Sequence, residues 1–179
     1  GKIAGSFTED IQHVPDAEVV AVGSRNQATA DAFGNKYNIP NRHSSYHDLA
    51  NDPDVDVIYI LGDATETRLI KPYLDVNVST FAERIPLYAS SKSHSKQIDR
   101  TDKGDLDGLY FTELPWMLDG QISQHNLRQQ YESLWPDNAD INQRLFAMAF
   151  DAASMLGDVK QLSMVQGKRF SGISGQLRI

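Results

Sequence analysis

The stretch Asp56-Val57-Ile58-Tyr59-Ile60-Leu61 is the strongest secondary-structure signal in this sequence of 179 residues. It is almost continuously apolar, and Pro53 and Gly62 bound it. Such a run is typical of a parallel strand that is buried on both faces, because a half-exposed strand would alternate apolar and polar residues. We therefore predict a strand over residues 56–61 in the interior of a parallel sheet.

Helical and strand patterns alternate on both sides of this stretch. The expected elements are, in order, a helix at 3–14, a strand at 18–22, a helix at 26–38 that Asn26 can cap, a short turn at 46–49 capped by Ser44 or Ser45, the strand at 56–61, a helix through 69–74, a strand at 78–82, a helix at 91–101 and a strand at 109–112. Strands that alternate with helices form βαβ units with right-handed crossovers. The predicted fold class is α/β, with a doubly wound, mostly parallel sheet and helices on both faces.

The pattern changes after residue 114. Two helices are expected at 119–134 and 140–155, and residues 159–165 predict one more strand, whereas residues 167–179 give no firm assignment. We predict two domains, 1–114 and 115–179, of which the second is a remnant of an α+β domain. Trp116, Met117 and Trp135 are interpreted as packing residues.

Composition narrows the function classes. The chain has no cysteine, which excludes disulfides, thiolate zinc sites and thiol catalysis. Its formal net charge of −7 argues against a nucleic-acid partner. No apolar run reaches the roughly 20 residues that span a bilayer, and no N-terminal signal pattern is visible. From these features we expect no membrane partner and a cytoplasmic location.

Several ordered segments resemble the glucose-fructose oxidoreductase/inositol dehydrogenase (Gfo/Idh/MocA) family. They are Ala21-Val22-Gly23-Ser24-Arg25, Ser45-Tyr46-His47-Asp48-Leu49, the run at 52–60, Ala82-Glu83-Arg84-Ile85-Pro86-Leu87, Phe111-Thr112-Glu113 with Trp116-Met117, and Leu156-Gly157-Asp158-Val159-Lys160. The resemblance implies a Rossmann-type dinucleotide-binding domain. It also implies an NAD(P)-dependent oxidoreductase that moves a hydride between nicotinamide and a carbinol carbon of a sugar or polyol.

The resemblance also implies a set of cofactor-binding residues. Gly1, Lys2, Ile3 and Ala4 correspond to the end of the phosphate loop, and Leu61, Gly62 and Glu83 follow later strands. Ser24 and Arg25 end the second strand, where a hydroxyl and a guanidinium suit a 2′-phosphate. The expected cofactor is NADP, with NAD as the alternative. A solvated loop arginine is the competing interpretation of Arg25.

The catalytic assignment falls on Glu83 and Arg84, with a structural ion pair as the alternative. Arg84 occupies the family's lysine position, and an arginine cannot serve as a base. Ile85 is an apparent insertion, and Thr67 stands where relatives carry histidine. We therefore expect impaired activity. The alternative is a non-catalytic Rossmann-like fragment that binds nucleotide weakly, or only folds and associates.

Three further expectations concern assembly and metal binding. The family's first strand lies before residue 1, and the tail at 168–179 could fold back as a substitute, with a frayed tail or an incomplete sequence as the alternative. Uncovered sheet edges and apolar faces predict a homo-oligomer. His43 and His47 have i,i+4 spacing but no third ligand, so we interpret them as surface histidines and expect no metal site.

Overall fold

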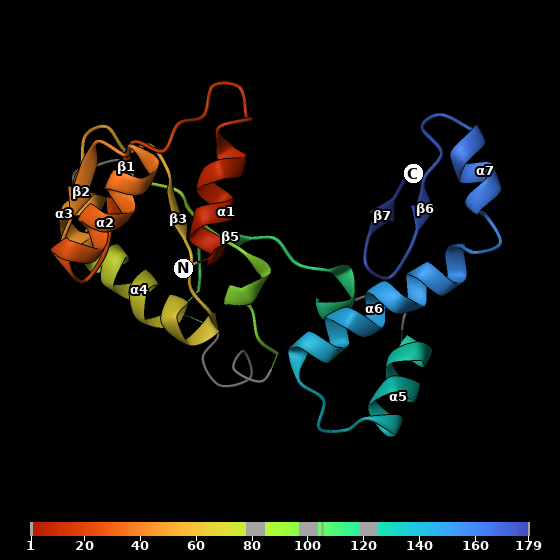
Figure 1. Ribbon diagram of the computed structural model, residues 1–179. Coiled ribbons are helices and arrows are strands. Elements are labelled where there is room, and N and C mark those ends of the chain that lie inside the picture. The colour runs from red at the N-terminus through yellow and green to blue at the C-terminus, as the bar shows by residue number, and fades with distance from the viewer. Residues whose placement is uncertain (1, 78–84, 97–103, 105, 119–124, 179) are drawn as a thin grey trace. The chain divides into compact units, whose positions relative to one another are not determined.

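A computed structural model describes residues 2–77, 85–96, 104, 106–118 and 125–178 of the chain. Contacts divide the chain into two compact units, Gly1–Phe111 (unit 1) and Thr112–Ile179 (unit 2), shown in Figure 1. Each unit has its own hydrophobic core. None of the described helices combines the length and the apolar character needed to cross a membrane.

Unit 1 alternates helices and strands. Its elements are α1 (Lys2–Ile11), β1 (Ala21–Gly23), α2 (Gln27–Tyr37), β2 (Asn41–His43), α3 (Tyr46–Ala50), β3 (Ile58–Ile60), α4 (Ala64–Asn77), β4 (Leu87–Ala89), the 3-10 helix η1 (Ser91–Ser93) and β5 (Leu109–Phe111). Local capping explains two helix starts, since Asn26 Oδ1 accepts from the N–H of Ala28 at 2.8 Å and Ser45 Oγ accepts from the N–H of Asp48 at 3.1 Å. Both predicted caps are confirmed.

The strands of unit 1 form two small parallel sheets. β1 pairs with β2 from Ala21 opposite Asn41 to Gly23 opposite His43. β4 lies between β3 and β5 and is parallel to both. No pairing joins β1 to β3 among the described residues. The mixed α/β class with parallel strands is therefore confirmed, but two small sheets stand where one was predicted.

The core of unit 1 gathers around β3. Ile58 and Ile60 are buried with Leu74 of α4, Leu87 of β4 and Leu109 of β5. The predicted strand at 56–61 is confirmed in its central residues. Among the described residues it lies at the edge of its three-stranded sheet and not inside it, although its apolar side chains are buried as expected.

Other strand predictions in unit 1 are less accurate. β2 was not predicted, because Asn41-Arg42-His43 carries no apolar pattern and becomes a strand only through its pairing with β1. The strand expected at 78–82 lies outside the described residues, and the described strand β4 follows it. Where a helix was expected at 91–101, the described part is only the short 3-10 turn η1.

Unit 2 is mainly helical. Its elements are the 3-10 helix η2 (Pro115–Met117), α5 (His125–Leu134), α6 (Asp140–Met155), α7 (Val159–Met164), β6 (Phe170–Ser171) and β7 (Gln176–Leu177). The strand predicted at 159–165 is wrong, because these residues form α7 and one following residue. Val159, Leu162 and Val165 recur at a spacing of three, which fits one helix face, and a helix satisfies its own backbone hydrogen bonds.

The C-terminal tail pairs with itself. Phe170 lies opposite Leu177 and Ser171 opposite Gln176 in an antiparallel hairpin. The suggestion that this tail substitutes for a strand of the parallel sheet is therefore wrong for the described structure. A two-residue strand next to glycines carries too little local signal for its partner to be predicted.

Aromatic residues dominate the core of unit 2. Trp116 and Met117 of η2 are completely buried, and Tyr131, Ala147 and Ile173 are buried around them. This confirms Trp116 and Met117 as packing residues. Trp135, also predicted to pack, is 50% exposed.

Two buried carboxylates connect the elements of unit 2. Asp151 of α6 accepts hydrogen bonds from the N–H groups of Ile173 at 2.8 Å and Ser174 at 2.7 Å, and from the Ser174 hydroxyl. Glu113 receives Arg144 Nη2 at 2.5 Å and Nε at 3.2 Å, at different carboxylate oxygens. The hairpin and the segment that leads into η2 are thus attached to α6.

Candidate functional site

The residues predicted to bind a cofactor are only partly brought together. Arg25 and Leu61 line one cavity of unit 1, which has a volume of about 470 Å³. Lys2 and Ile3 are exposed in the first turn of α1, and Ala4 follows them. Ser24 follows β1 and Gly62 comes after β3, and neither is among the described residues that line that cavity. Gly1, Glu83 and Arg84 lie outside the described residues.

The two histidines with i,i+4 spacing contact different partners. His43 Nε2 lies 2.7 Å from Asp52 Oδ2, and His47 contacts Asn51. Burial by itself raises the pKa of Asp52, but hydrogen bonds from the N–H of Asp54, from His43 and from Asn41 together hold that pKa below its ordinary value. Within the described ranges no group of three or more His, Asp or Glu side chains could hold a metal ion.

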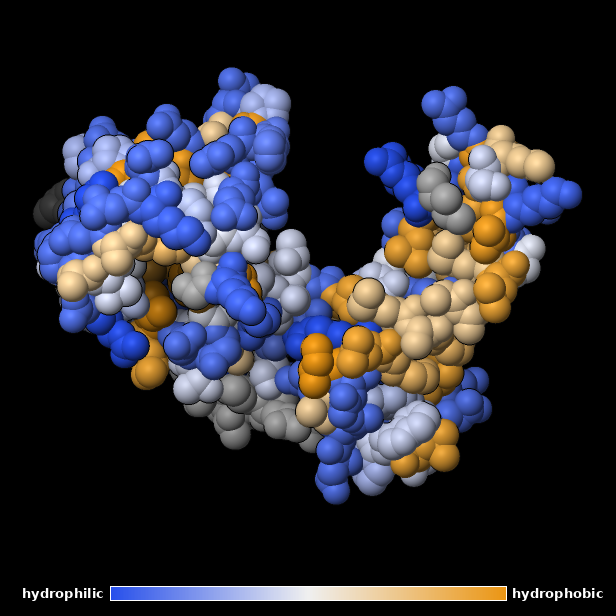
Figure 2. Space-filling model, viewed as in Figure 1, coloured by the Kyte–Doolittle hydropathy of each residue, from blue (hydrophilic) through white to orange (hydrophobic). Residues whose placement is uncertain are grey.

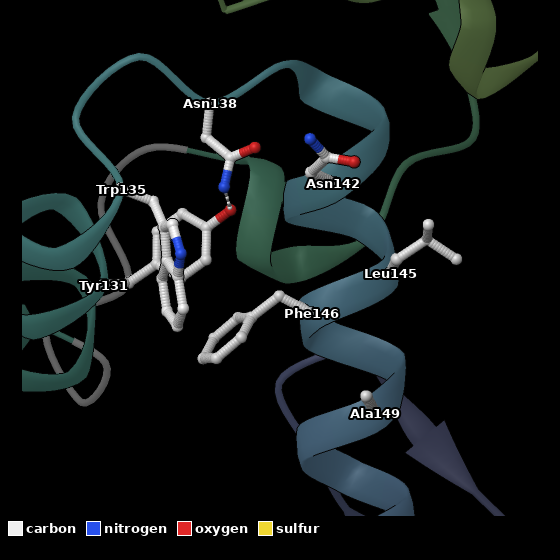
Figure 3. Close-up of a pocket in the computed structure, with 7 residues that line it drawn as sticks. All are labelled: Tyr131, Trp135, Asn138, Asn142, Leu145, Phe146 and Ala149. Carbon is white, nitrogen blue, oxygen red and sulfur yellow. Dashed lines mark hydrogen bonds between the residues drawn. The ribbon is translucent and has the colours of Figure 1, made fainter.

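A second cavity, in unit 2, lies between the end of α5 and the first half of α6. Its volume is about 300 Å³, and Figure 3 shows the side chains around it. They are Tyr131, Trp135, Asn138, Asn142, Leu145, Phe146 and Ala149, which together define the aromatic pocket. The sequence forms it locally, since Pro136 follows the α5 helix and the short loop at 135–139 turns the chain into α6.

The floor of the aromatic pocket is fixed by ring contacts. The centroids of Tyr131 and Phe146 are 4.5 Å apart, those of Tyr131 and Trp135 5.3 Å, and those of Trp116 and Phe146 5.3 Å. Tyr131 is buried, its hydroxyl receives a hydrogen bond from Asn138 Nδ2 (Figure 3), and burial raises the pKa of the phenol. The floor is therefore neutral and packed before any ligand arrives.

The rim of the aromatic pocket is apolar and exposed to solvent. Trp135 is half exposed and Leu145 is 56% exposed, and the lining also includes the Asn142 amide of α6 (Figure 3). Aromatic side chains with an apolar body and a polar handle are enriched at protein interfaces. The described residues of the lining include no carboxylate, imidazole or cation, so their chemistry is that of packing and amide hydrogen bonding.

An apolar stripe extends from the pocket along α6. Ile141, Leu145 and Met148 recur at i, i+4 and i+7 and are all exposed, whereas Ala147 and Asp151 on the same helix are buried. Figure 2 shows a continuous run of apolar side chains over α6. Contiguous exposed apolar surface of this kind marks interaction sites in soluble proteins.

Sequence reasoning did not identify the pocket or the stripe. The signal was present, because α6 carries more apolar residues than one buried face requires. Ile141, Leu145 and Met148 form a second apolar row beside the row that contains Ala147. A helix that is apolar on two sides needs a second partner.

Comparison with known proteins gives a consistent result. A family model described as LppC putative lipoprotein matches residues 44–179. Penicillin-binding protein activator LpoA from Vibrio vulnificus is 32% identical over 128 residues, and the protein of that name from Photobacterium profundum is 29% identical over 126 residues. Each match covers 70% of this chain and 20% of the relative. The chain thus spans about a fifth of the length of these curated relatives.

Solved structures with the same fold come from Haemophilus influenzae. The LpoA (YraM) C-domain, described as a regulator of PBP1A, aligns with a TM-score of 0.58 at 20% identity, covering 98% of this chain and 58% of that one. Full-length LpoA aligns with a TM-score of 0.58 at 21% identity, covering 98% of this chain and 34% of that one. At these identities the likeness concerns the fold.

These matches overturn the resemblance to the Gfo/Idh/MocA family, and with it the function drawn from it. The relatives are penicillin-binding protein activators and not oxidoreductases, so the predicted hydride transfer, the enzyme class and the NADP or NAD cofactor are wrong. The physical reason is that the quoted segments mark βα units. Such units recur in many α/β folds and carry no chemistry of their own.

The predictions on partners and location are corrected by the same matches. A sugar or polyol substrate and a homo-oligomer were expected, but the relatives are named for a protein partner, a penicillin-binding protein. A cytoplasmic location was expected, but the matching family is described as lipoproteins. Composition misled here, because the overall composition of a chain does not report the signals that direct a protein to a membrane surface.

Proposed function

This chain belongs to the LppC putative lipoprotein family, and from that premise we propose that it is part of an activator of a penicillin-binding protein and acts by protein contact. The observation that carries the proposal is the aromatic pocket with its apolar stripe on α6. Both lie within residues 44–179, the range that the family model matches.

The geometry supports a role in binding through pre-organisation. Tyr131 and Phe146 are already packed against Trp116, so only the rim side chains lose freedom when a partner docks. Trp135 offers a large apolar surface in a pocket that the Asn142 amide also lines. Tryptophan and tyrosine are the residue types most often found as binding hot spots.

The direct test is binding of the 179-residue chain to the penicillin-binding protein 1A of the same organism, measured by biolayer interferometry. Trp135→Ala is expected to weaken binding about 30-fold, because a hot-spot residue contributes roughly 2 kcal/mol or more. Leu145→Asp should weaken it further by placing a charge in the apolar stripe. Val76→Ser, at an exposed apolar residue of unit 1, is the matched control and should bind like wild type.

The proposal fails if the chain does not bind, or if Val76→Ser weakens binding as much as Trp135→Ala. Circular dichroism of each variant before the binding measurement separates loss of the surface from loss of the fold.

We also propose that the two sheets of unit 1 are halves of one doubly wound arrangement, with β1 and β3 as the inner strands. The packing of Val20 and Ala21 against the core that contains Ile58 supports it. If the two sheets open together, hydrogen exchange at the amides of Val22 and Tyr59 should report the same free energy of opening. Unequal opening would contradict it.

The division into domains near residue 114 remains a proposal as well. The boundary between the units, after Phe111, supports a division at this part of the chain. Two separate transitions in urea unfolding, one for unit 1 and one for unit 2, would support this division.

A further inference from the structure

The cavity of unit 1 lies after the ends of β1 and β2, which form one parallel sheet, and of β3, which belongs to the other parallel sheet. The chain leaves β1 at Arg25, leaves β2 at Ser44 and Ser45, and leaves β3 at Leu61, and these residues line the cavity. Tyr46 of α3 and residues Glu66, Leu69, Ile70 and Tyr73 of α4 complete the lining. Ligands of parallel α/β sheets bind at the carboxyl ends of the strands. Its volume of about 470 Å³ is in the range of pockets that hold one small molecule.

One wall of this cavity is apolar and uncovered. Leu69 is 71% exposed, and Tyr73 and Leu61 are exposed beside it. Large apolar side chains around a concave surface favour a ligand with an apolar body, because its binding removes their surface from water.

The lining of the cavity also includes hydrogen-bond donors that are free within the described residues. Among the described residues of the lining Arg25 is the only cation, and it makes no hydrogen bond or ion pair with any other described residue. The Ser44 hydroxyl is likewise free within the described ranges. Ser45 is already used, because its Oγ caps α3 and donates to Asp48 Oδ2 at 2.7 Å.

The acidic residue of the lining does not neutralise Arg25. Glu66 Oε2 accepts from the N–H of Asp63 at 3.2 Å, while the N–H of Glu66 donates to Asp63 Oδ1 at 2.8 Å. This reciprocal pair closes the first turn of α4. The guanidinium of Arg25 therefore remains available as a planar donor for a carboxylate, sulfonate or phosphate.

We propose that the cavity of unit 1 binds a small molecule with an apolar body and a single anionic head group. The head group is held by Arg25 and Ser44, and the body lies against Leu61, Leu69 and Tyr73. This ligand differs from the dinucleotide considered above, since Ser24 does not line the cavity. The site is separate from the aromatic pocket, and its failure or success leaves the proposed protein contact untouched.

The test uses two fluorescent probes that share one aromatic body. 8-Anilinonaphthalene-1-sulfonate carries one sulfonate, and N-phenyl-1-naphthylamine lacks it. Titration of the 179-residue chain, with no partner protein present, is expected to show saturable binding of the sulfonate probe at one site. Because the net charge of −7 repels anions on the whole, this binding depends on a local cation.

Arg25→Gln is expected to weaken binding of the sulfonate probe about tenfold or more and binding of the neutral probe less than twofold. Only the sulfonate makes the charge-assisted hydrogen bond. Arg169→Gln changes the net charge equally at an exposed position outside the cavity and should have no effect. Leu69→Ser is expected to weaken both probes several-fold, whereas Val76→Ser on the same helix, 83% exposed and outside the cavity, should weaken neither.

The proposal is overturned if the sulfonate probe does not saturate, if Arg25→Gln behaves like Arg169→Gln, or if Val76→Ser weakens binding as much as Leu69→Ser. Thermal unfolding followed by circular dichroism shows whether each variant is folded. A variant that unfolds is replaced by Arg25→Lys, which keeps the charge but loses the planar fork, and should fall between wild type and Arg25→Gln.

Discussion

Units 1 and 2 reach a buried core by different means. Unit 1 places short strands side by side, and aliphatic residues such as Ile58, Leu74 and Leu87 fill the space between strands and helices. In the described part of unit 2 the strands are two residues long and form one hairpin, and aromatic rings pack around Trp116. Its elements depend on buried side-chain bonds, above all those of Asp151.

The difference shows where each unit is vulnerable. Backbone pairing in unit 1 is spread over several strands, so its weakest points are apolar residues whose removal leaves a cavity. In unit 2 one carboxylate satisfies two backbone N–H groups and a hydroxyl, so its weakest point is polar. Unit 2 also carries the exposed apolar stripe on α6, which does not pack into its own core.

Asp151→Ala should have the largest effect. It leaves the N–H groups of Ile173 and Ser174 without an acceptor and should lower the free energy of unfolding of unit 2 by about 4 kcal/mol. The sequence has two tryptophans, Trp116 and Trp135, and both lie in unit 2, so tryptophan fluorescence during urea unfolding follows that unit. Asp137→Ala, at an exposed position, is the control, and an equal loss there would contradict the role given to Asp151.

Leu74→Ala should come next and should act on unit 1. Removing this buried side chain is expected to cost about 3 kcal/mol, since the surrounding strands cannot fully close the cavity. Hydrogen exchange of the β3 and β4 amides measures it. The midpoint of urea unfolding that tryptophan fluorescence reports for unit 2 should not change. A loss of stability in unit 2 as large as that in unit 1 would show that the two units do not unfold separately. Val76→Ala on the same helix should change little.

Asp52→Asn is expected to destabilise unit 1 by about 1 kcal/mol at neutral pH through weakened hydrogen bonds. The pKa of Asp52 is lowered in the folded chain, so the stabilisation that its charge supplies is present above the unfolded pKa. It is lost as the pH falls through the folded pKa, below about pH 4. When thermal unfolding is measured between pH 3 and pH 7, the unfolding temperature of Asp52→Asn should therefore fall less toward acid pH than that of the wild type. An equal fall would argue against this role, and Asp54→Asn is the neighbouring control.

Leu145→Ser should have the smallest effect on stability, within about 0.5 kcal/mol, because the side chain is mostly exposed. Fluorescence-detected urea unfolding measures it against Ala147→Ser, a buried position of the same helix. A loss above about 2 kcal/mol for Leu145→Ser would mean that the stripe on α6 is part of the core. The stripe would then not be available to a partner.

Sequence patterns predicted the local features well. The apolar run at Ile58–Ile60, the cap at Asn26 and the buried pair Trp116 and Met117 all lie as expected. The candidate site was not predicted, because exposure of Leu145 and half-exposure of Trp135 follow from which side of α6 faces the core. Periodicity shows that a helix has apolar faces, but it does not show which of them is covered.

The sequence by itself determined the α/β class, the helix caps and the composition that excludes thiol chemistry, since each depends on residues close together in the chain or on residue types alone. Only the tertiary structure decided that Asn41–His43 is a strand, that Val159–Met164 is a helix and that Asp151 holds the C-terminal hairpin. Strand pairing and burial are contacts between distant segments. Their free energy depends on which edge or face the rest of the fold leaves open, and a local pattern does not carry that information.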